Sequence, residues 1–142
     1  AITSAICNSF KTEILTGVHD FTASTGNTFN LALYTSSASL GAGTTAYTTS
    51  NEVSGTGYTA KGNALTSVTP TLDSSTAVCD FADTSFTSAS FTARGCLIFN
   101  DSATGDPAVC AIDFGSDKTV TSGTFTIQFP TADASNAIIR IA

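Results

Sequence analysis

The chain has 142 residues, 42% hydrophobic and only 11% charged, with a formal net charge of −6 at pH 7. This length suits one domain. The acidic excess repels a phosphate backbone, and the five basic residues are scattered, so composition argues against nucleic acid as a partner. No apolar run approaches the roughly 20 residues that span a bilayer, which argues against a membrane partner.

The first residues carry no basic region followed by an apolar segment, which is the pattern of a secretory signal peptide. A small residue such as Ala1 is what remains when an initiator methionine is removed. We therefore expect synthesis in the cytoplasm without a signal peptide.

Residues 4–16 are the only segment with helical spacing of apolar residues. Ile6, Phe10 and Ile14 recur at intervals of four, the first residue is a serine that can cap a helix, and Gly17 is a natural C-cap. The spacing predicts a helix over residues 4–16. Its apolar stripe can pack on the domain's own sheet or on another subunit, and the sequence leaves both open.

Residues 36–57 are rich in serine, threonine and glycine and predict a long ordered loop. Loops often carry binding residues, so we expect this loop to act as an interface arm together with the helix. The candidate interface residues from these two segments and the residue that follows them are Ile6, Phe10, Ile14, Tyr47, Val53 and Tyr58.

Two apolar runs, 96–99 and 108–112, flank a polar stretch containing Asn, Asp, Ser, Gly and Pro. This pattern predicts a β-hairpin whose strands are covered on both faces. Near the C-terminus, Phe125, Ile127 and Phe129 alternate with polar residues and are expected to meet the core. The rhythm of short strands and turns predicts one all-β domain over 1–142, an antiparallel β-sandwich of jelly-roll or immunoglobulin-like type with one short N-terminal α-helix.

Four cysteines, Cys7, Cys79, Cys96 and Cys110, are too widely spaced for a metal knuckle. Two interpretations of their state remain. Apolar surroundings favour buried free thiols. A cross-strand disulfide between Cys96 and Cys110 is the alternative, and it requires Cα atoms within about 7 Å.

The sequence contains no recognisable catalytic pattern. His19 is the only histidine and is expected to lie at the surface or near the helix end rather than in a catalytic triad. Asp80 and Asp83, or Asp101 and Asp106, could be considered as paired carboxylates or calcium ligands, but aspartates in turns usually bind the local backbone. We therefore expect a protein that is not an enzyme, with no catalytic residues, no cofactor and no metal.

Four segments that together cover nearly the whole chain carry a resemblance to known proteins: FKTEILTGVHDF, FNLALYTSSASLGAGTTAYTTSNEVSGTGYTAKGNAL, FTARGCLIFN and AIDFGSDKTVTSGTFTIQFPTADASNAIIRIA. They resemble a family of small virion structural proteins encoded by tailed bacteriophages, mostly of unassigned role. The resemblance implies no catalytic or ligand residues. Apolar residues commonly occupy the positions of Cys79, Cys96 and Cys110 in that family, which agrees with buried thiols.

The resemblance implies a non-enzymatic protein of the virion. The leading expectation is a head decoration or cement protein that binds and stabilises the capsid lattice, with phage capsid or tail proteins as partners and a homo-oligomer in the assembly. One alternative is a tail or fibre-associated host-binding module with Tyr34, Tyr47 and Tyr58 in a shallow receptor site. An alternative of another class is a secreted carbohydrate-binding β-sandwich, against which the absence of tryptophan counts.

Overall fold

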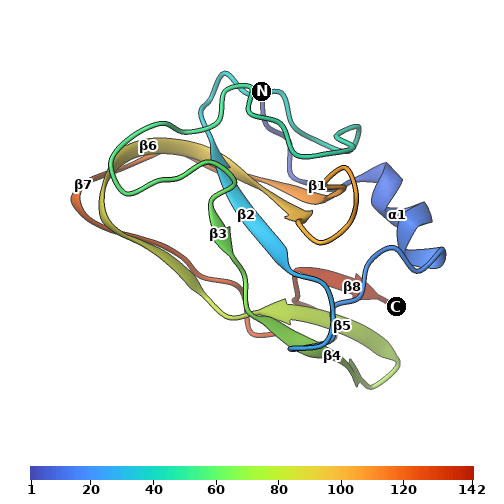
Figure 1. The fold of residues 1–142 in the computed structure, drawn as a ribbon. Helices are drawn as coiled ribbons and strands as arrows, with labels where there is room; N and C mark the ends of the chain where they lie inside the picture. Colours follow the sequence, from blue (N-terminus) through green and yellow to red (C-terminus); the bar gives the residue numbers. More distant parts are fainter.

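A computed structural model describes residues 1–142 and shows two packed antiparallel sheets with one short helix (Figure 1). The larger sheet has the strand order β1-β7-β6-β2-β3 and the smaller sheet the order β4-β5-β8. The elements are β1 (Ala5–Ile6), α1 (Asn8–Leu15), β2 (Phe29–Tyr34), β3 (Asn63–Ala64), β4 (Ser67–Asp73), β5 (Thr76–Phe81), β6 (Thr84–Asn100), β7 (Ala108–Ile127) and β8 (Ile139–Ile141). The predicted antiparallel β-sandwich is confirmed.

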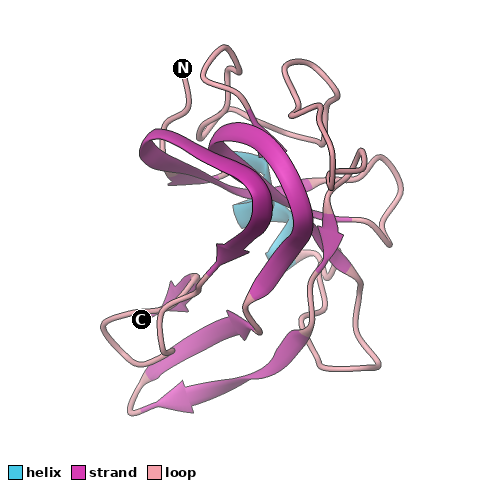
Figure 2. Ribbon diagram, turned by 90° about the vertical axis from the view of Figure 1, so that its left-hand side faces the viewer, coloured by secondary structure: helices cyan, strands magenta, loops and turns pink.

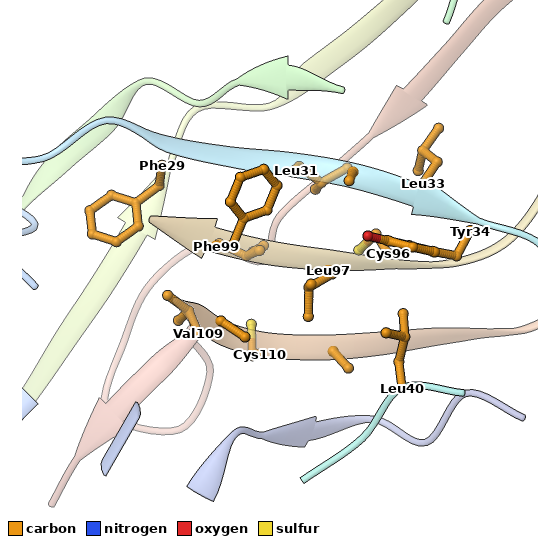
Figure 3. Packing of buried hydrophobic residues seen from close by; sticks show 14 of the residues in the cluster. Phe29, Leu31, Leu33, Tyr34, Leu40, Cys96, Leu97, Phe99, Val109 and Cys110 are labelled. Atoms are coloured by element: carbon orange, nitrogen blue, oxygen red, sulfur yellow. The ribbon is translucent and has the colours of Figure 1, made fainter. Parts of the chain in front are cut away.

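The predicted hairpin is the centre of the larger sheet. β6 pairs with β7 on one side and with β2 on the other, so its C-terminal half has a strand on each side. All residues from Cys96 to Asn100 are buried, and so are all six residues of β2. Figure 3 shows buried side chains of β2, β6 and β7 packed together. The continuous apolar runs form central strands, because a strand that is covered on both faces needs apolar residues at every position.

β6 and β7 continue well beyond this centre and curl into an arch (Figure 2). Register shifts interrupt their pairing at four places, and such irregularities bend a hairpin. β1 pairs only with Cys110 and Ala111 of β7. The outer edge of β7 over residues 113–127 therefore has no neighbouring strand.

The helix is shorter than predicted, because residues 5–6 form strand β1 and α1 begins only at Asn8. Cys7 occupies the N-cap position without a side-chain cap, while the Ser4 hydroxyl accepts a hydrogen bond from the Asp113 N–H instead. At the other end Gly17 has φ +78°, and the Val18 N–H donates to the Glu13 carbonyl at 3.0 Å. The predicted glycine C-cap is therefore correct.

Residues 36–57 contain no named strand, yet they lie against the core rather than projecting as an arm. The Val53 N–H donates to the Leu33 carbonyl at 2.9 Å, and the Tyr47 N–H donates to the Asp106 carbonyl at 3.0 Å. The Val53 side chain is 5% exposed. The segment is thus an ordered loop, as predicted, and it covers the larger sheet, while its role as an interface arm stays a prediction.

Candidate functional site: an apolar groove on the open side of the sandwich

The most prominent hollow of the molecule is an apolar groove of about 700 Å³, and 12 of its 17 lining residues are hydrophobic. Its walls come from β1, β7 and the segment that leads into β8. The lining residues are Ser4, Ala5, Ile6, Cys96, Cys110, Ala111, Ile112, Phe114, Lys118, Phe125, Thr126, Ile127, Gln128, Phe129, Pro130, Ala137 and Ile138. Pockets of this volume are in the range that binds small molecules or several side chains of a partner.

The groove exists because the smaller sheet ends before it covers the whole of β7. Phe125, Ile127 and Phe129 alternate with exposed residues, as the sequence predicts, but they are only half-buried. The smaller sheet ends at β8, a strand of three residues that pairs only with β5. Because no further strand follows β8, these side chains line the groove instead of a closed core.

Two features of the groove suit an extended chain. The outer edge of β7 beside it offers backbone N–H and C=O groups that no strand pairs, and such edges accept strands from partners. Gly115 and Ser122 have positive φ angles of +84° and +44°, which interrupt the extended backbone, so the unpaired edge consists of short extended stretches. Lys118 is the one charged residue of the lining and makes no ion pair, so the groove favours an acidic group near it.

The structure separates the candidate interface residues from one another. Val53 is buried in the core at 5% exposure, which contradicts a role in surface contact, and Phe10 is only 3% exposed but forms part of the wall of a cleft. Tyr47 and Tyr58 are half-buried against the core. Of the six candidates only Ile6 lines the groove, and Ile14 lines a smaller cleft beside α1.

The three tyrosines do not form the exposed cluster that a shallow receptor site would need. Tyr34 is fully buried, and its hydroxyl donates to the Thr48 carbonyl at 2.6 Å. The hydroxyls of Tyr47 and Tyr58 donate to the two oxygens of Glu52, each at 2.6 Å. Burial, and next the hydrogen bond to Glu52, raise the pKa of Tyr47 to about 12. These polar groups are used to hold the 36–57 segment on the sheet.

His19 is buried rather than at the surface, but it lies near the end of α1, which is the other position expected from the sequence. Its Nε2 lies 3.0 Å from Glu13 Oε1, and its Nδ1 lies 3.1 Å from Asn100 Nδ2. Because the Asn100 amide nitrogen can only donate, Nδ1 accepts and Nε2–H donates. Both ring nitrogens are therefore engaged in joining α1 to the central hairpin.

The aspartates considered as ligands are engaged with other groups. Asp101 and Asp106 both contact Lys61 Nζ, at 2.9 and 3.0 Å. The Asp83 carboxylate accepts from the Phe129 N–H at 2.9 Å. No group of three or more His, Cys, Asp and Glu side chains is close enough to hold a metal ion.

All four cysteines are free and buried, so the disulfide alternative is not realised. Cys96 lies opposite Ile112 and Cys110 lies opposite Ile98, which places the two cysteines diagonally rather than face to face. Burial raises the pKa of Cys7 to about 11 and the pKa values of Cys79 and Cys96 to about 12.

We expect the native thiols to resist alkylation. The thiolate is the reactive form, and burial both disfavours it and blocks access. Iodoacetamide at pH 8 should modify the folded protein at least about 100-fold more slowly than the protein in concentrated guanidinium, because reaction requires unfolding. Mass spectrometry over a time course measures this ratio. Rapid labelling of Cys96 or Cys110 in the folded protein would show that the groove floor is open.

Sequence reasoning did not identify most of the groove. Phe114, Lys118, Ala137 and Ile138 carried no motif, and only the alternation around Ile127 pointed to an apolar face there. Which residues share the groove depends on the curl of β7 and on the short length of β8.

No protein-family model, curated protein or solved structure matches this chain. The single helix, α1, has eight residues, and no helix is long and apolar enough to cross a membrane.

Proposed function

We propose that this chain is a non-enzymatic structural protein of a phage virion, a head decoration protein that receives an extended apolar segment of a capsid subunit in its groove. The observation that carries this proposal is the groove of about 700 Å³ beside the unpaired edge of β7. The sequence resemblance supplies the virion as the setting.

The chemistry of the groove specifies the segment it receives. Alternating apolar side chains would bury against residues such as Ile112, Phe114 and Phe125, while the backbone of the segment pairs with the edge of β7. Burial of apolar surface contributes about 25 cal/mol per Å², so a few such side chains suffice for a lasting contact at high local concentration. An acidic residue of the segment would meet Lys118.

A tail or fibre-associated module would use the same groove and differ only in location. The receptor-binding alternative expected exposed tyrosines, and the hydroxyls of Tyr34, Tyr47 and Tyr58 instead bind Thr48 and Glu52 within the protein. The head location is the leading expectation from the sequence resemblance, and it is tested first.

A cryo-EM map of the particles of the phage that encodes this chain tests the location. We expect copies at regular positions on the head, with the β7 edge and the groove against a capsid subunit. Copies confined to the tail would replace head decoration by the tail alternative. Particles without any copy would refute a virion role.

Ile138→Asp tests whether the groove itself attaches the protein. Ile138 is half-buried in the groove lining, and an aspartate there places a charge where apolar side chains should bury. We expect the variant to be incorporated into particles about tenfold less than the wild type, measured as copies per particle by quantitative mass spectrometry. Thr49→Asp adds the same charge at an exposed position of the 36–57 segment, outside both the groove and the edge of β7, and should be incorporated normally.

Thermal unfolding of the free Ile138→Asp protein separates a binding defect from a folding defect. If its melting temperature falls, Lys118→Glu gives the same test without packing loss, since Lys118 is exposed. Normal incorporation of both groove variants would exclude the groove as the attachment site.

A further inference from the structure

The apolar groove has one cation at its margin. Lys118 of β7 lies opposite Ala93 of β6, and Val120 lies opposite Phe91. The side chains of directly opposed residues leave an antiparallel ladder on the same face. Because Ala93 and Phe91 are both buried, Lys118 projects from the inner side of the curled hairpin, where it lines the groove (Figure 2). Lys118 is itself exposed, so its ammonium group remains in water.

No anion of the protein balances this lysine. Asp113 and Asp117, the carboxylates nearest to it in the sequence, lie 3.2 and 3.5 Å from nitrogen atoms of Arg94. Lys118 forms no ion pair, and no acidic residue lines the groove. An anion that enters the groove would therefore meet an unpaired cation and no carboxylate in the lining, although the chain has a net charge of −6.

Beyond this cation the groove is apolar and reaches the core. Phe114 and Phe125 belong to its wall, with ring centroids 6.2 Å apart. Cys96 and Cys110 line its floor, are 0% and 3% exposed, and lie among the packed core side chains in Figure 3. The volume of about 700 Å³ is within the range of ligand pockets. Apolar depth with a single charge at the margin matches a molecule that has an apolar tail and one anionic end.

We propose that the groove binds a monomeric anionic amphiphile of the fatty-acid class, with its hydrocarbon tail against the apolar floor and its carboxylate at Lys118. The inference uses the groove of the proposed function but not its virion setting, so either can fail without the other. Because both occupants need the same space, a bound amphiphile and a capsid segment would exclude each other.

Isothermal titration calorimetry with octanoate, decanoate and dodecanoate, each below its micelle concentration, tests the position of the tail. Each added methylene would bury more apolar surface in the groove. We therefore expect the affinity to rise roughly tenfold for every two methylenes. Equal affinities along the series, or no binding of dodecanoate, would overturn the proposal.

Lys118→Gln tests the position of the carboxylate. We expect this variant to bind decanoate about threefold more weakly than the wild type, because an exposed ion pair is lost. It should bind decanol, which has the same tail without a charge, as the wild type does. Unchanged decanoate affinity, or an equal loss for decanol, would overturn the proposal.

Lys11→Gln is the matched control. Lys11 is an exposed lysine of α1 that forms no ion pair and lies outside the groove, so its replacement should leave both affinities unchanged. Particle incorporation separates this inference from the proposed function. If amphiphiles fail to bind while Ile138→Asp still reduces incorporation, only the amphiphile is rejected. The reverse pattern rejects only the capsid segment.

Discussion

Asn100→Ala is expected to destabilise the protein by about 4 kcal/mol and to lower its melting temperature by roughly 10 °C. The Asn100 side chain is fully buried, and its Oδ1 accepts from the N–H groups of Ser102 and Ala103 at 3.0 and 3.2 Å. Its Nδ2 lies 3.1 Å from both His19 Nδ1 and Asn27 Oδ1. Alanine removes the partner of His19 Nδ1 and of the Ser102 and Ala103 N–H groups, whereas Asn27 Oδ1 keeps its hydrogen bond from the Asp20 N–H. Each buried polar group that is left unsatisfied costs about 1–3 kcal/mol.

Chemical denaturation followed by circular dichroism measures this loss. Asn8→Ala is a suitable control, because Asn8 is exposed at the first turn of α1 and its side chain makes no hydrogen bond within the protein. Its replacement should change the free energy of unfolding by less than about 0.5 kcal/mol. Equal stability of Asn100→Ala and the wild type would show that the network does not hold α1 and the 19–27 segment to the hairpin.

Gly62→Ala is expected to cost at least about 3 kcal/mol, because two penalties combine. Gly62 has φ +66°, a conformation that residues with a Cβ adopt at a cost. A Cβ at this position would also overlap the backbone carbonyl oxygen of Leu31, in the centre of the larger sheet. Relief of that overlap requires β2 or β3 to move, and Asn63 pairs with Leu31 there.

Gly43→Ala makes the same chemical change where the structure has room. Nothing lies within 4 Å of a Cβ at Gly43, and its φ is not positive. Alanine there should be neutral or slightly stabilising, because it restricts the unfolded chain. Urea denaturation of the two variants side by side separates backbone strain from the general effect of losing a glycine. A similar stability of both variants would contradict the close approach at Gly62.

The central hairpin could be predicted because its signal is local. Apolar runs at 96–99 and 108–112 around a turn-forming stretch lead to one strand pair, and burial on both faces follows from their continuous apolar character. The glycine C-cap of α1 was predictable for the same reason. Ile6 was assigned to the helix by its spacing, but pairing with Cys110 of β7 overrode that local preference.

The orientation of the aromatic residues was harder to predict. Tyr47 and Tyr58 lie in a segment of polar composition, which suggested exposure. Glu52 satisfies both hydroxyls in the fold, so the rings pack on Phe99 and Phe86 while their polar ends remain bonded. Nothing in the sequence shows that these three residues, up to 11 positions apart, would converge.

The sequence by itself determined the all-β class, the central strands and the inward face of residues 124–129, because these depend on the period of a strand and on the order of apolar residues. Only the tertiary structure decided that Phe125, Ile127 and Phe129 line an open groove and that Leu72 and Ile141 stay in water. The alternation of polar and apolar residues determines which side chains project from the same face of a strand. Whether another element covers that face depends on the lengths of β7 and β8 and on the bends in β7. These are set by pairings between residues far apart in the chain.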